Sequence, residues 1–411
     1  MKTFGLLGKK LSHSYSPQIH AHLGTPTYSL YEKSEEEVAA FIAAREFDGI
    51  NVTIPYKKTV LPLLDALSPM ASRLGSVNTI VKRADGTLFG HNTDYFGFSY
   101  MVEKSGISIE GKKVLVLGSG GASVTVCAVL SDMGAGEVIV ISRSGEENYE
   151  NISRHADADI IVNTTPVGMY PHTGASPVRL ADFPRLSGVL DLIYNPDKTA
   201  LLLEAEKLGI PHINGLTMLV AQGKESAEYF CGKEIPSAVI DKTVSALSKS
   251  QKNIVLIGMP GCGKSTLGKS LAEKTGRRFF DADEVIKEKA GKTIPEIFKE
   301  SGEEGFRKIE TEVLAELGRE SGIVLSTGGG CITREENYPL LHQNGVIFYL
   351  KRDIETLPRD GRPLSEKADL YKMYEVRRPL YEKFADFTVE NRYETENIEE
   401  RVLSIYENSC H

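Results

Sequence analysis

Two glycine-rich turns, each between an apolar run and a helix-compatible run, predict an α/β chain with two nucleotide-binding units. Residues 258–266 fit G-x-x-x-x-G-K-[ST], after the apolar run 254–257 and before the run 267–274. Residues 118–123 lie in the same context, between the apolar run 114–117 and the run 124–133. Strands that alternate with helices form parallel sheets. We therefore predict two units of this kind, preceded by a further α/β domain.

Length, charge and cysteine content limit the class of protein. The chain has 411 residues, which is more than one domain of ~100–200 residues. Its net charge of −8 and pI of about 5.7 argue against nucleic-acid binding. Five scattered cysteines without a C-x-x-C pair predict reduced thiols in a cytoplasmic protein. We see no targeting signal, and no apolar run approaches the ~20 residues of a membrane span.

The turn at 258–266 is the most specific motif. Its glycines allow backbone N–H groups to surround phosphate oxygens, and the following helix directs its positive end to the same anion. Lys264 is expected to reach the nucleotide phosphates, and Ser265 to hold Mg²⁺. The motif predicts a bound nucleotide and leaves the acceptor open.

The N-terminal segment begins with a predicted strand at residues 3–7, followed by a serine-rich stretch. In an extended chain Ser14 and Ser16 share one face, where two hydroxyls would suit a carboxylate or a polyol. Pro17 is suited to start the next helix. From this stretch alone, a serine-rich helix N-cap is the favoured interpretation.

Three further segments combine polar and apolar residues at expected strand ends. Around residue 52, Asn51 and Thr53 alternate with Val52 and Ile54, so the polar pair should face a cleft and the apolar pair the core. Lys57 follows just beyond this strand. Residues 75–79 and 90–94 are small-residue turns that carry carboxamides, hydroxyls and an acid, including Asn78 and Asp94.

In combination, S-x-S-x-S-P, N-V-T-x-P-x-K, V-N-T and N-T-D resemble the substrate domain of shikimate dehydrogenase. The resemblance implies that Lys57 and Asp94 form an acid/base pair. Reduction of a ketone by hydride leaves an alkoxide, which a lysine held by a carboxylate can protonate. It also implies which residues surround the cyclohexene ring: Ser14, Ser16, Asn51, Thr53, Asn78 and Asp94.

The turn at 118–123 matches the start of a dinucleotide fingerprint and the family's G-x-G-G-A-[SA]. The next predicted strand, 138–141, precedes Arg143, where an NAD enzyme usually carries an acid. An arginine suits the 2′-phosphate of NADP, so we predict NADP; a solvated loop arginine is the alternative.

The sequence departs from the family after Arg143. A second basic residue commonly follows, whereas this chain has Glu146 and Glu147. The stretch to residue 157 is also short, without room for the usual helix and strand. We therefore predict a trimmed Rossmann-like sheet.

Three later segments resemble family motifs: 163–169 (N-[AT]-T-P-x-G-M), 191–196 (D-x-x-Y-x-P) and 214–222 (N-G-x-G-M-L-x-x-Q), with Thr217 in place of a glycine. They imply that Tyr194 and Gln222 approach the substrate, although Gln222 alone would be a helix-surface residue. The resemblance assigns NADP to Gly118, Gly120, Gly121, Ala122, Arg143, Thr164 and Met218.

The polar segment 244–252 is expected to link the two halves. We predict a substrate domain at 1–100, an NADP-binding domain with a returning C-terminal helix at 101–243, and a P-loop domain at 253–411.

Acidic, basic and glycine motifs follow the phosphate turn. Asp281 and Asp283 are two apart at a strand end, where both can face a site. Arg307 and Glu310 are neighbours on one helical face, as a surface salt bridge or as an arginine held ready for a carboxylate. The triple glycine 328–330 lets the backbone approach a small ligand closely.

Together, the phosphate turn, D-x-D, F-R-x-x-E and G-G-G resemble shikimate kinase over residues 253–409. The resemblance places ATP at Gly258, Gly261, Cys262, Gly263, Lys264, Ser265, Thr266 and Arg359. It places Mg²⁺ at Ser265 and Asp281, and shikimate at Asp283, Arg307, Gly329, Gly330 and Arg377. Lys264, Asp283 and the lid residue Arg362 would act in catalysis. Cys262 and Cys331 flank this site as small residues that fit or, less simply, as a thiol switch.

The two resemblances imply neighbouring reactions of aromatic amino-acid biosynthesis. The first half would reduce 3-dehydroshikimate with NADPH, and the second would phosphorylate shikimate with ATP and Mg²⁺. The expected partners are these small molecules, without nucleic acid or membrane. Two alternatives are an NAD-dependent quinate or shikimate oxidoreductase in the first half, and a non-catalytic binding module in either half.

Overall fold

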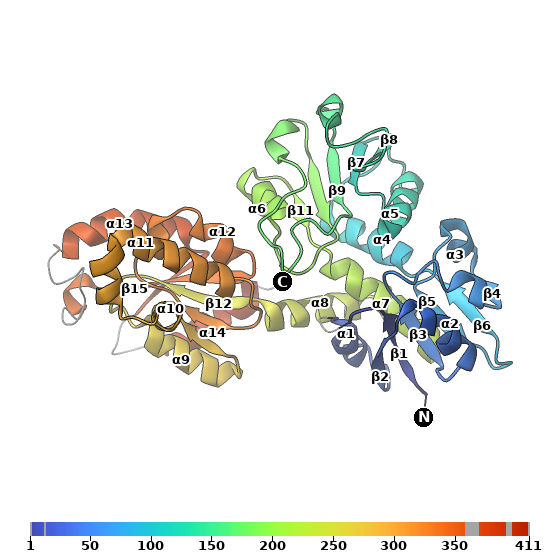
Figure 1. The fold of residues 1–411 in the computed structure, drawn as a ribbon, viewed down its shortest axis with the longest axis horizontal. Coiled ribbons are helices and arrows are strands. Elements are labelled where there is room, and N and C mark those ends of the chain that lie inside the picture. Colours follow the sequence, from blue (N-terminus) through green and yellow to red (C-terminus); the bar gives the residue numbers. More distant parts are fainter. Residues whose placement is uncertain (1, 12–13, 358–369, 392–396, 410–411) are drawn as a thin grey trace. The chain divides into compact units, whose positions relative to one another are not determined.

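The computed structural model describes residues 2–11, 14–357, 370–391 and 397–409 (Figure 1). The chain divides into two compact units. The first contains residues 1–167, 176–194 and 204–244, and the second contains residues 168–175, 195–203 and 245–411. Helix α8 (Ala238–Gln251) crosses the last boundary, so most of the segment expected as a linker is helical.

The N-terminal sheet is mixed. Strand β1 pairs in parallel with β2 and β3, whereas β5 runs antiparallel to both β3 and β6. The start of β5 therefore lies at the same edge as the ends of β3 and β6. In order across the sheet, the strands are β2 (Tyr28–Glu32), β1 (Phe4–Gly8), β3 (Gly49–Val52), β5 (Thr79–Lys82), β6 (Leu88–His91) and β4 (Ala66–Leu67). The helices of this part are α1 (Ser16–His22), α2 (Glu35–Ala44) and α3 (Pro69–Leu74).

Two expectations for this part need correction. Val52 is buried, but Ile54 is 76% exposed and does not face the core. Strand β3 ends at Val52, so the alternation of faces does not continue to Ile54. Ser16 is the first residue of α1, with Pro17 in its first turn, so Ser14 and Ser16 do not form an extended pair.

The second sheet of the first unit is entirely parallel. Strand β7 lies between β8 and β9, so the chain reverses its direction of winding at β7. Dinucleotides bind at such switch points. The order is β11 (His212–Ile213), β10 (Gly188–Asp191), β9 (Ile160–Asn163), β7 (Lys113–Leu117) and β8 (Glu137–Ile141), with helices α4 (Asp94–Ser105), α5 (Gly121–Asp132), α6 (Ala200–Lys207) and α7 (Leu216–Cys231).

The trimmed Rossmann-like sheet is confirmed. Between β8 and β9 the chain forms only a 3-10 turn at Ile152–His155. Strand β8 is consequently the last strand at its side of the sheet.

The sheet of the second unit is also parallel, and β12 is its central strand. The phosphate turn follows β12 directly and leads into α9, as the sequence predicts. The order is β13 (Phe279–Asp281), β14 (Val324–Ser326), β12 (Asn253–Ile257), β15 (Gly345–Lys351) and β16 (Phe387–Glu390). The helices are α9 (Lys264–Thr275), α10 (Ala282–Ala290), α11 (Ile294–Leu317), α12 (Asn337–His342), α13 (Leu370–Phe384) and α14 (Ile398–Ser409).

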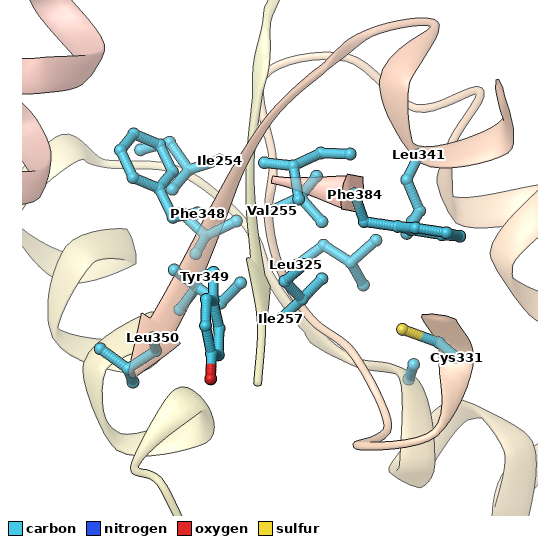
Figure 2. Close-up of a cluster of buried hydrophobic side chains, with 14 of the residues drawn as sticks. Ile254, Val255, Ile257, Leu325, Cys331, Leu341, Phe348, Tyr349, Leu350 and Phe384 are labelled. Atoms are coloured by element: carbon cyan, nitrogen blue, oxygen red, sulfur yellow. The ribbon is translucent and has the colours of Figure 1, made fainter. Parts of the chain in front are cut away.

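Buried side chains cover both faces of this sheet. Figure 2 shows Ile254 and Phe348 on one side of the central strands, and Val255 with Leu341 and Phe384 on the other. Strands buried on both faces read as continuous apolar runs, which explains residues 254–257 and 346–350. The core holds the strand ends, and therefore the site at their edge, in fixed positions.

Helix α11 contains one break. Gly302 has φ +68° and ψ −172°, so the helix stops and restarts there. This left-handed conformation favours glycine. The restarted half carries Arg307 and Glu310.

Among the described residues, no helix has the length and apolar character needed to span a membrane. Cys127, Cys231, Cys262 and Cys331 are free thiols.

Candidate active sites

A lysine and an aspartate form a close pair at one edge of the N-terminal sheet. Lys57 Nζ lies 2.6 Å from Asp94 Oδ2, and both side chains are largely buried. Asp94 begins α4, where the positive end of the helix favours its carboxylate. Asn78 Nδ2 donates to the other oxygen, Asp94 Oδ1, at 2.9 Å. The carboxylate is thus held from two sides, and it holds the ammonium group.

Asn51 belongs to a buried hydrogen-bond network beside this pair. Its Nδ2 donates to Ser226 Oγ at 2.8 Å and to Thr79 Oγ1 at 3.0 Å. Ser226 Oγ also lies 3.1 Å from Thr93 Oγ1, which accepts from Asn78. Sequence reasoning missed Thr79, Thr93 and Ser226. Ser226 lies one helical turn after Gln222, and this spacing was the available signal.

His20 is a second missed residue and supports Asn51 from the opposite side. His20 Nε2 lies 3.1 Å from Asn51 Oδ1, which also accepts from the Tyr28 hydroxyl at 2.8 Å. Burial lowers the pKa of His20 to about 3, so the ring is neutral. A neutral ring can donate from Nε2 and accept at Nδ1 from Thr25, which lies 3.0 Å away. These contacts fix the amide orientation of Asn51.

The remaining predicted substrate residues lie in the same unit. Ser14 Oγ accepts from the backbone N–H of Ser16, and Tyr15 between them packs on Tyr194 with ring centroids 5.2 Å apart. Thr53 follows β3 and is partly buried. Gln222 lies on α7 and donates to the carbonyl of Leu219 in its own helix at 2.7 Å. One of its two amide N–H donors is thus used within the helix, which leaves the second N–H for a ligand.

The turn after β7 is open on the side of the expected cofactor. A Cβ added to Gly120 or Gly121 would meet no atom within 4 Å, so backbone groups there are accessible to a ligand. At Gly118, with φ +103°, an added Cβ would lie 2.9 Å from Thr164 Oγ1. Thr164 in turn donates to the carbonyl of Leu117 at 2.7 Å. This arrangement fits a pyrophosphate at the start of α5, where Ala122 lies.

Arg143 lies at the end of β8 and is exposed. The loop behind it folds on itself, because the N–H of Ser142 donates to the carbonyl of Glu147 at 3.1 Å. Glu147 Oε2 contacts His155 Nε2 at 2.9 Å, so this acid points to the 3-10 turn. The guanidinium of Arg143 is therefore accessible for a phosphate group.

Met218, another residue predicted to contact NADP, is buried on α7.

The second unit contains a cavity of about 850 Å³ at the edge where its strands end. Its lining joins three motifs of the sequence: the phosphate turn, the two aspartates and the triple glycine. The predicted residues in the lining are Gly261, Gly263, Lys264, Ser265, Thr266, Asp281, Asp283, Arg307, Gly329, Gly330 and Arg377.

In the phosphate turn, Lys264 is buried and its Nζ donates to the carbonyls of Gly258 and Met259 at 2.9 and 3.1 Å. These bonds hold the ammonium over the loop. Ser265 Oγ donates to Asp281 Oδ2 at 2.5 Å. Mg²⁺ in nucleotide sites is usually held by one or two protein oxygens together with substrate phosphates, so Ser265 and Asp281 fit it.

Asp281 caps α10 and accepts from the N–H of Asp283 at 3.1 Å, so the two carboxylates are close. Burial raises the pKa of Asp283, and the charge of Asp281 raises it further. Lys264 and Arg307 oppose this shift. A carboxylate with a raised pKa is suited to accept a proton from a hydroxyl group.

Arg307 and Glu310 are not a surface pair. Glu310 is fully buried, and Arg307 Nη1 donates to its Oε2 at 2.7 Å. Arg307 Nε and Glu310 Oε1 are buried without a partner in the described structure, so each retains one free hydrogen-bonding position. Burial raises the pKa of Glu310, and the neighbouring arginine works in the opposite direction. The carboxylate of an acceptor molecule could accept a hydrogen bond from the unpartnered Nε of Arg307.

The triple glycine makes room for this arginine. A Cβ on Gly330 would overlap with the Arg307 guanidinium, and one on Gly328 would lie 2.6 Å from Glu310 Oε1. Arg377 Nη1 donates to the carbonyl of Gly329 at 3.2 Å, which places a second guanidinium at the same end of the cavity.

The two cysteines fit the simpler interpretation. Cys262 is buried in the phosphate turn, and Cys331 Sγ lies 3.3 Å from Thr327 Oγ1. Burial raises the pKa of Cys331 to about 12. A thiol that stays protonated is a poor nucleophile. The predicted positions Arg359 and Arg362 lie outside the described residues.

Comparison with known proteins identifies both parts. Residues 6–80 match the family model for the shikimate dehydrogenase substrate binding domain, and residues 260–407 match that for shikimate kinase. A shikimate dehydrogenase (NADP(+)) from Clostridium perfringens is 35% identical over 256 residues, which are 57% of this chain and 94% of the relative. The chain belongs to the shikimate dehydrogenase family. A shikimate kinase domain follows its dehydrogenase part.

Solved structures agree with this assignment. Shikimate dehydrogenase 1 from Peptoclostridium difficile is 38% identical, with a TM-score of 0.57, over 60% of this chain and 98% of the other. A quinate dehydrogenase from Corynebacterium glutamicum in complex with NAD is 29% identical, with a TM-score of 0.55, over 59% of this chain and 98% of the other.

Replacement of Lys57 by alanine removes the ammonium group that Asp94 holds in the dehydrogenase part. We expect Lys57→Ala to lower the rate of ketone reduction by ~10²–10⁴-fold and to leave phosphorylation unchanged. Lys264→Ala should have the converse effect. Both rates are measured on each purified full-length variant. Loss of both activities in either folded variant would contradict two independent sites.

Replacement of Gly330 by alanine should displace Arg307, because the new Cβ would overlap with its guanidinium. We expect KM for shikimate in the kinase reaction to rise by roughly tenfold or more, the effect of losing a charged hydrogen bond, with little change in KM for ATP. The unchanged KM for ATP in the same assay is the control for folding of the kinase part. An unchanged KM for shikimate would mean that Arg307 does not bind the acceptor.

Proposed function

We propose that the protein catalyses two consecutive reactions of the shikimate pathway, which leads to chorismate and aromatic amino acids. The first is NADPH-dependent reduction of 3-dehydroshikimate to shikimate. The second is ATP- and Mg²⁺-dependent phosphorylation of shikimate to shikimate 3-phosphate. The observation that carries this proposal is that one chain joins a shikimate dehydrogenase fold to a shikimate kinase domain, so the product of one part is the substrate of the other.

In the dehydrogenase part, Lys57 is proposed as the proton donor to the oxygen of the reduced carbonyl group. Asp94 positions the ammonium at 2.6 Å, and Asn78 positions Asp94. NADPH supplies the hydride when it is bound. The hydroxyl and carboxylate groups of the substrate are proposed to bind to six residues: Ser14, Ser16, Asn51, Thr53, Tyr194 and Gln222.

The cofactor is proposed to lie at the switch point beside β7. The open backbone of Gly120 and Gly121 would hold the pyrophosphate, and Arg143 the 2′-phosphate. Thr164 supports the turn at Gly118, and Met218 lies on the helix that returns to the substrate domain. These residues would therefore set the orientation of the cofactor, because its phosphate groups and its reactive ring would lie beside different residues.

In the kinase part, Asp283 is proposed to accept the proton of the acceptor hydroxyl, and Lys264 to neutralise charge on the transferred phosphoryl group. Phosphoryl transfer depends mainly on positioning and charge neutralisation. Ser265 and Asp281 would hold Mg²⁺, which would supply positive charge beside the nucleotide phosphates. Arg307 and Arg377 would hold the acceptor carboxylate, with Gly329 and Gly330 beside them. ATP contacts by Arg359 and a catalytic role for Arg362 remain predictions.

One incubation tests both reactions. The protein is mixed with 3-dehydroshikimate, NADPH, ATP and Mg²⁺, and the products are identified by mass spectrometry. We expect shikimate 3-phosphate. Accumulation of shikimate alone would refute the kinase activity, and unchanged 3-dehydroshikimate would refute the dehydrogenase activity.

The NAD-dependent alternative is kept because a quinate dehydrogenase in complex with NAD has a similar fold. We expect wild-type protein to prefer NADPH, and Arg143→Ala to raise KM for NADPH by roughly tenfold while KM for NADH is unchanged. Arg154→Ala, which removes another exposed arginine of the same connection, is the matched control. A clear preference of the wild type for NADH, or for quinate in the oxidising direction, would favour the alternative.

We further propose that the protein acts in the cytoplasm on small molecules alone. The acidic net charge of −8 and the free cysteines among the described residues are consistent with this location.

A further inference from the structure

The end of β15 lies against the phosphate turn. β15 pairs in parallel with β12, with Tyr349 opposite Ile257, so both strands leave the sheet at the same edge. A Cβ on Gly258 would lie 2.6 Å from the carbonyl of Leu350. The residue that follows β15 is therefore in reach of a ligand in the phosphate turn.

That residue is Arg352, and its side chain lines the cavity of about 850 Å³ together with Lys264 and Ser265. Its Nε donates to Thr356 Oγ1 at 2.9 Å, which orients the guanidinium. Its Nη1 donates to the carbonyl of Gly261 at 3.4 Å, a long bond to the phosphate turn itself. Thr356 thus aims a cation at the loop that surrounds the phosphates.

The other cavity cations serve different groups. Arg307 is paired with Glu310 and Glu303, and Lys287 with Glu284 at 2.6 Å. The glutamate carboxylates therefore compensate much of the charge of Arg307 and Lys287. Arg377 contacts the triple glycine at the acceptor end. Arg352 and Lys264 are the two cavity cations whose described hydrogen bonds reach the phosphate turn.

We propose that Arg352 binds the phosphate chain of the nucleotide from the rim of the phosphate turn, as a second cation beside Lys264. The planar guanidinium offers several N–H donors in a fork that matches phosphate oxygens, and such bonds are stronger than neutral ones. The inference rests on the proposed kinase function. It adds an affinity determinant outside the G-x-x-x-x-G-K-[ST] motif.

The test compares Arg352→Ala and Arg352→Lys with Lys351→Ala. Lys351 is the preceding residue, 41% exposed, and faces Glu390 at 3.9 Å instead of the cavity, so its loss removes the same charge at nearly the same place. Dissociation constants of ADP and of inorganic tripolyphosphate are measured by titration calorimetry on the full-length chain. An unchanged KM for shikimate in the kinase reaction reports that the kinase part of each variant is folded.

We expect Arg352→Ala to weaken both ligands by roughly tenfold, Arg352→Lys to weaken them less, and Lys351→Ala to change them by less than about twofold. KM for ATP should rise in Arg352→Ala, while KM for shikimate stays the same.

Unchanged affinities in Arg352→Ala, with binding lost in Lys264→Ala, would overturn the inference and leave the kinase function standing. Weaker ADP binding with unchanged tripolyphosphate binding would also overturn it, because the contact would then be to the adenosine part. Failure of the wild type to bind any nucleotide would instead refute the proposed kinase function itself.

Discussion

The position of the strand ends is the constraint on which both sites depend. Parallel strands end at one edge of a sheet, and the chain can place side chains from distant segments there without long loops. In the second unit, the ends of β12, β13 and β14 bring together the phosphate turn, Asp281 and the triple glycine. In the N-terminal sheet, the antiparallel β5 meets β3 and β6 at the same edge, which joins Asn51, Asn78 and Asp94.

Charge burial distinguishes the two sites. The kinase cavity keeps Arg307 and Glu310 almost fully buried, and within the described part of the chain each has a hydrogen-bonding atom without a partner. Breaking a buried pair by removing one partner is costly, so the pair would keep its geometry if a carboxylate ligand bound there. The pair of Lys57 and Asp94 is more accessible to solvent, with side-chain exposures of 22% and 12%. The proposed proton donor Lys57 is therefore more accessible than Arg307, the residue proposed to orient the acceptor.

Local motifs were predictable from the sequence, and tertiary contacts were not. The phosphate turn, the dinucleotide turn and the short connection after β8 depend on neighbouring residues, so the pattern of glycines, apolar runs and lengths was sufficient. Ile54 was assigned to the wrong environment because the end of β3 depends on pairing with β1 and β5. The contacts of Ser226, Thr79 and His20 with Asn51 could not be predicted, because they arise from the burial of distant segments against one another. Arg352 has no motif either, because its place is defined by the strand beside it.

The short connection after β8 also affects the outer boundary of the dinucleotide sheet. As the last strand, β8 has one side without a neighbouring strand in the described structure, and its sequence Glu-Val-Ile-Val-Ile is strongly apolar. Such edges can recruit a strand from another chain, and proteins protect them with charged residues or covering segments. Glu137 is the first residue of β8, and the folded loop from Ser142 to Glu147 follows the strand directly. The proposed contact of Arg143 with the cofactor phosphate therefore lies at the end of an apolar edge strand, so a substitution there can affect both cofactor binding and the tendency of this edge to pair with another chain.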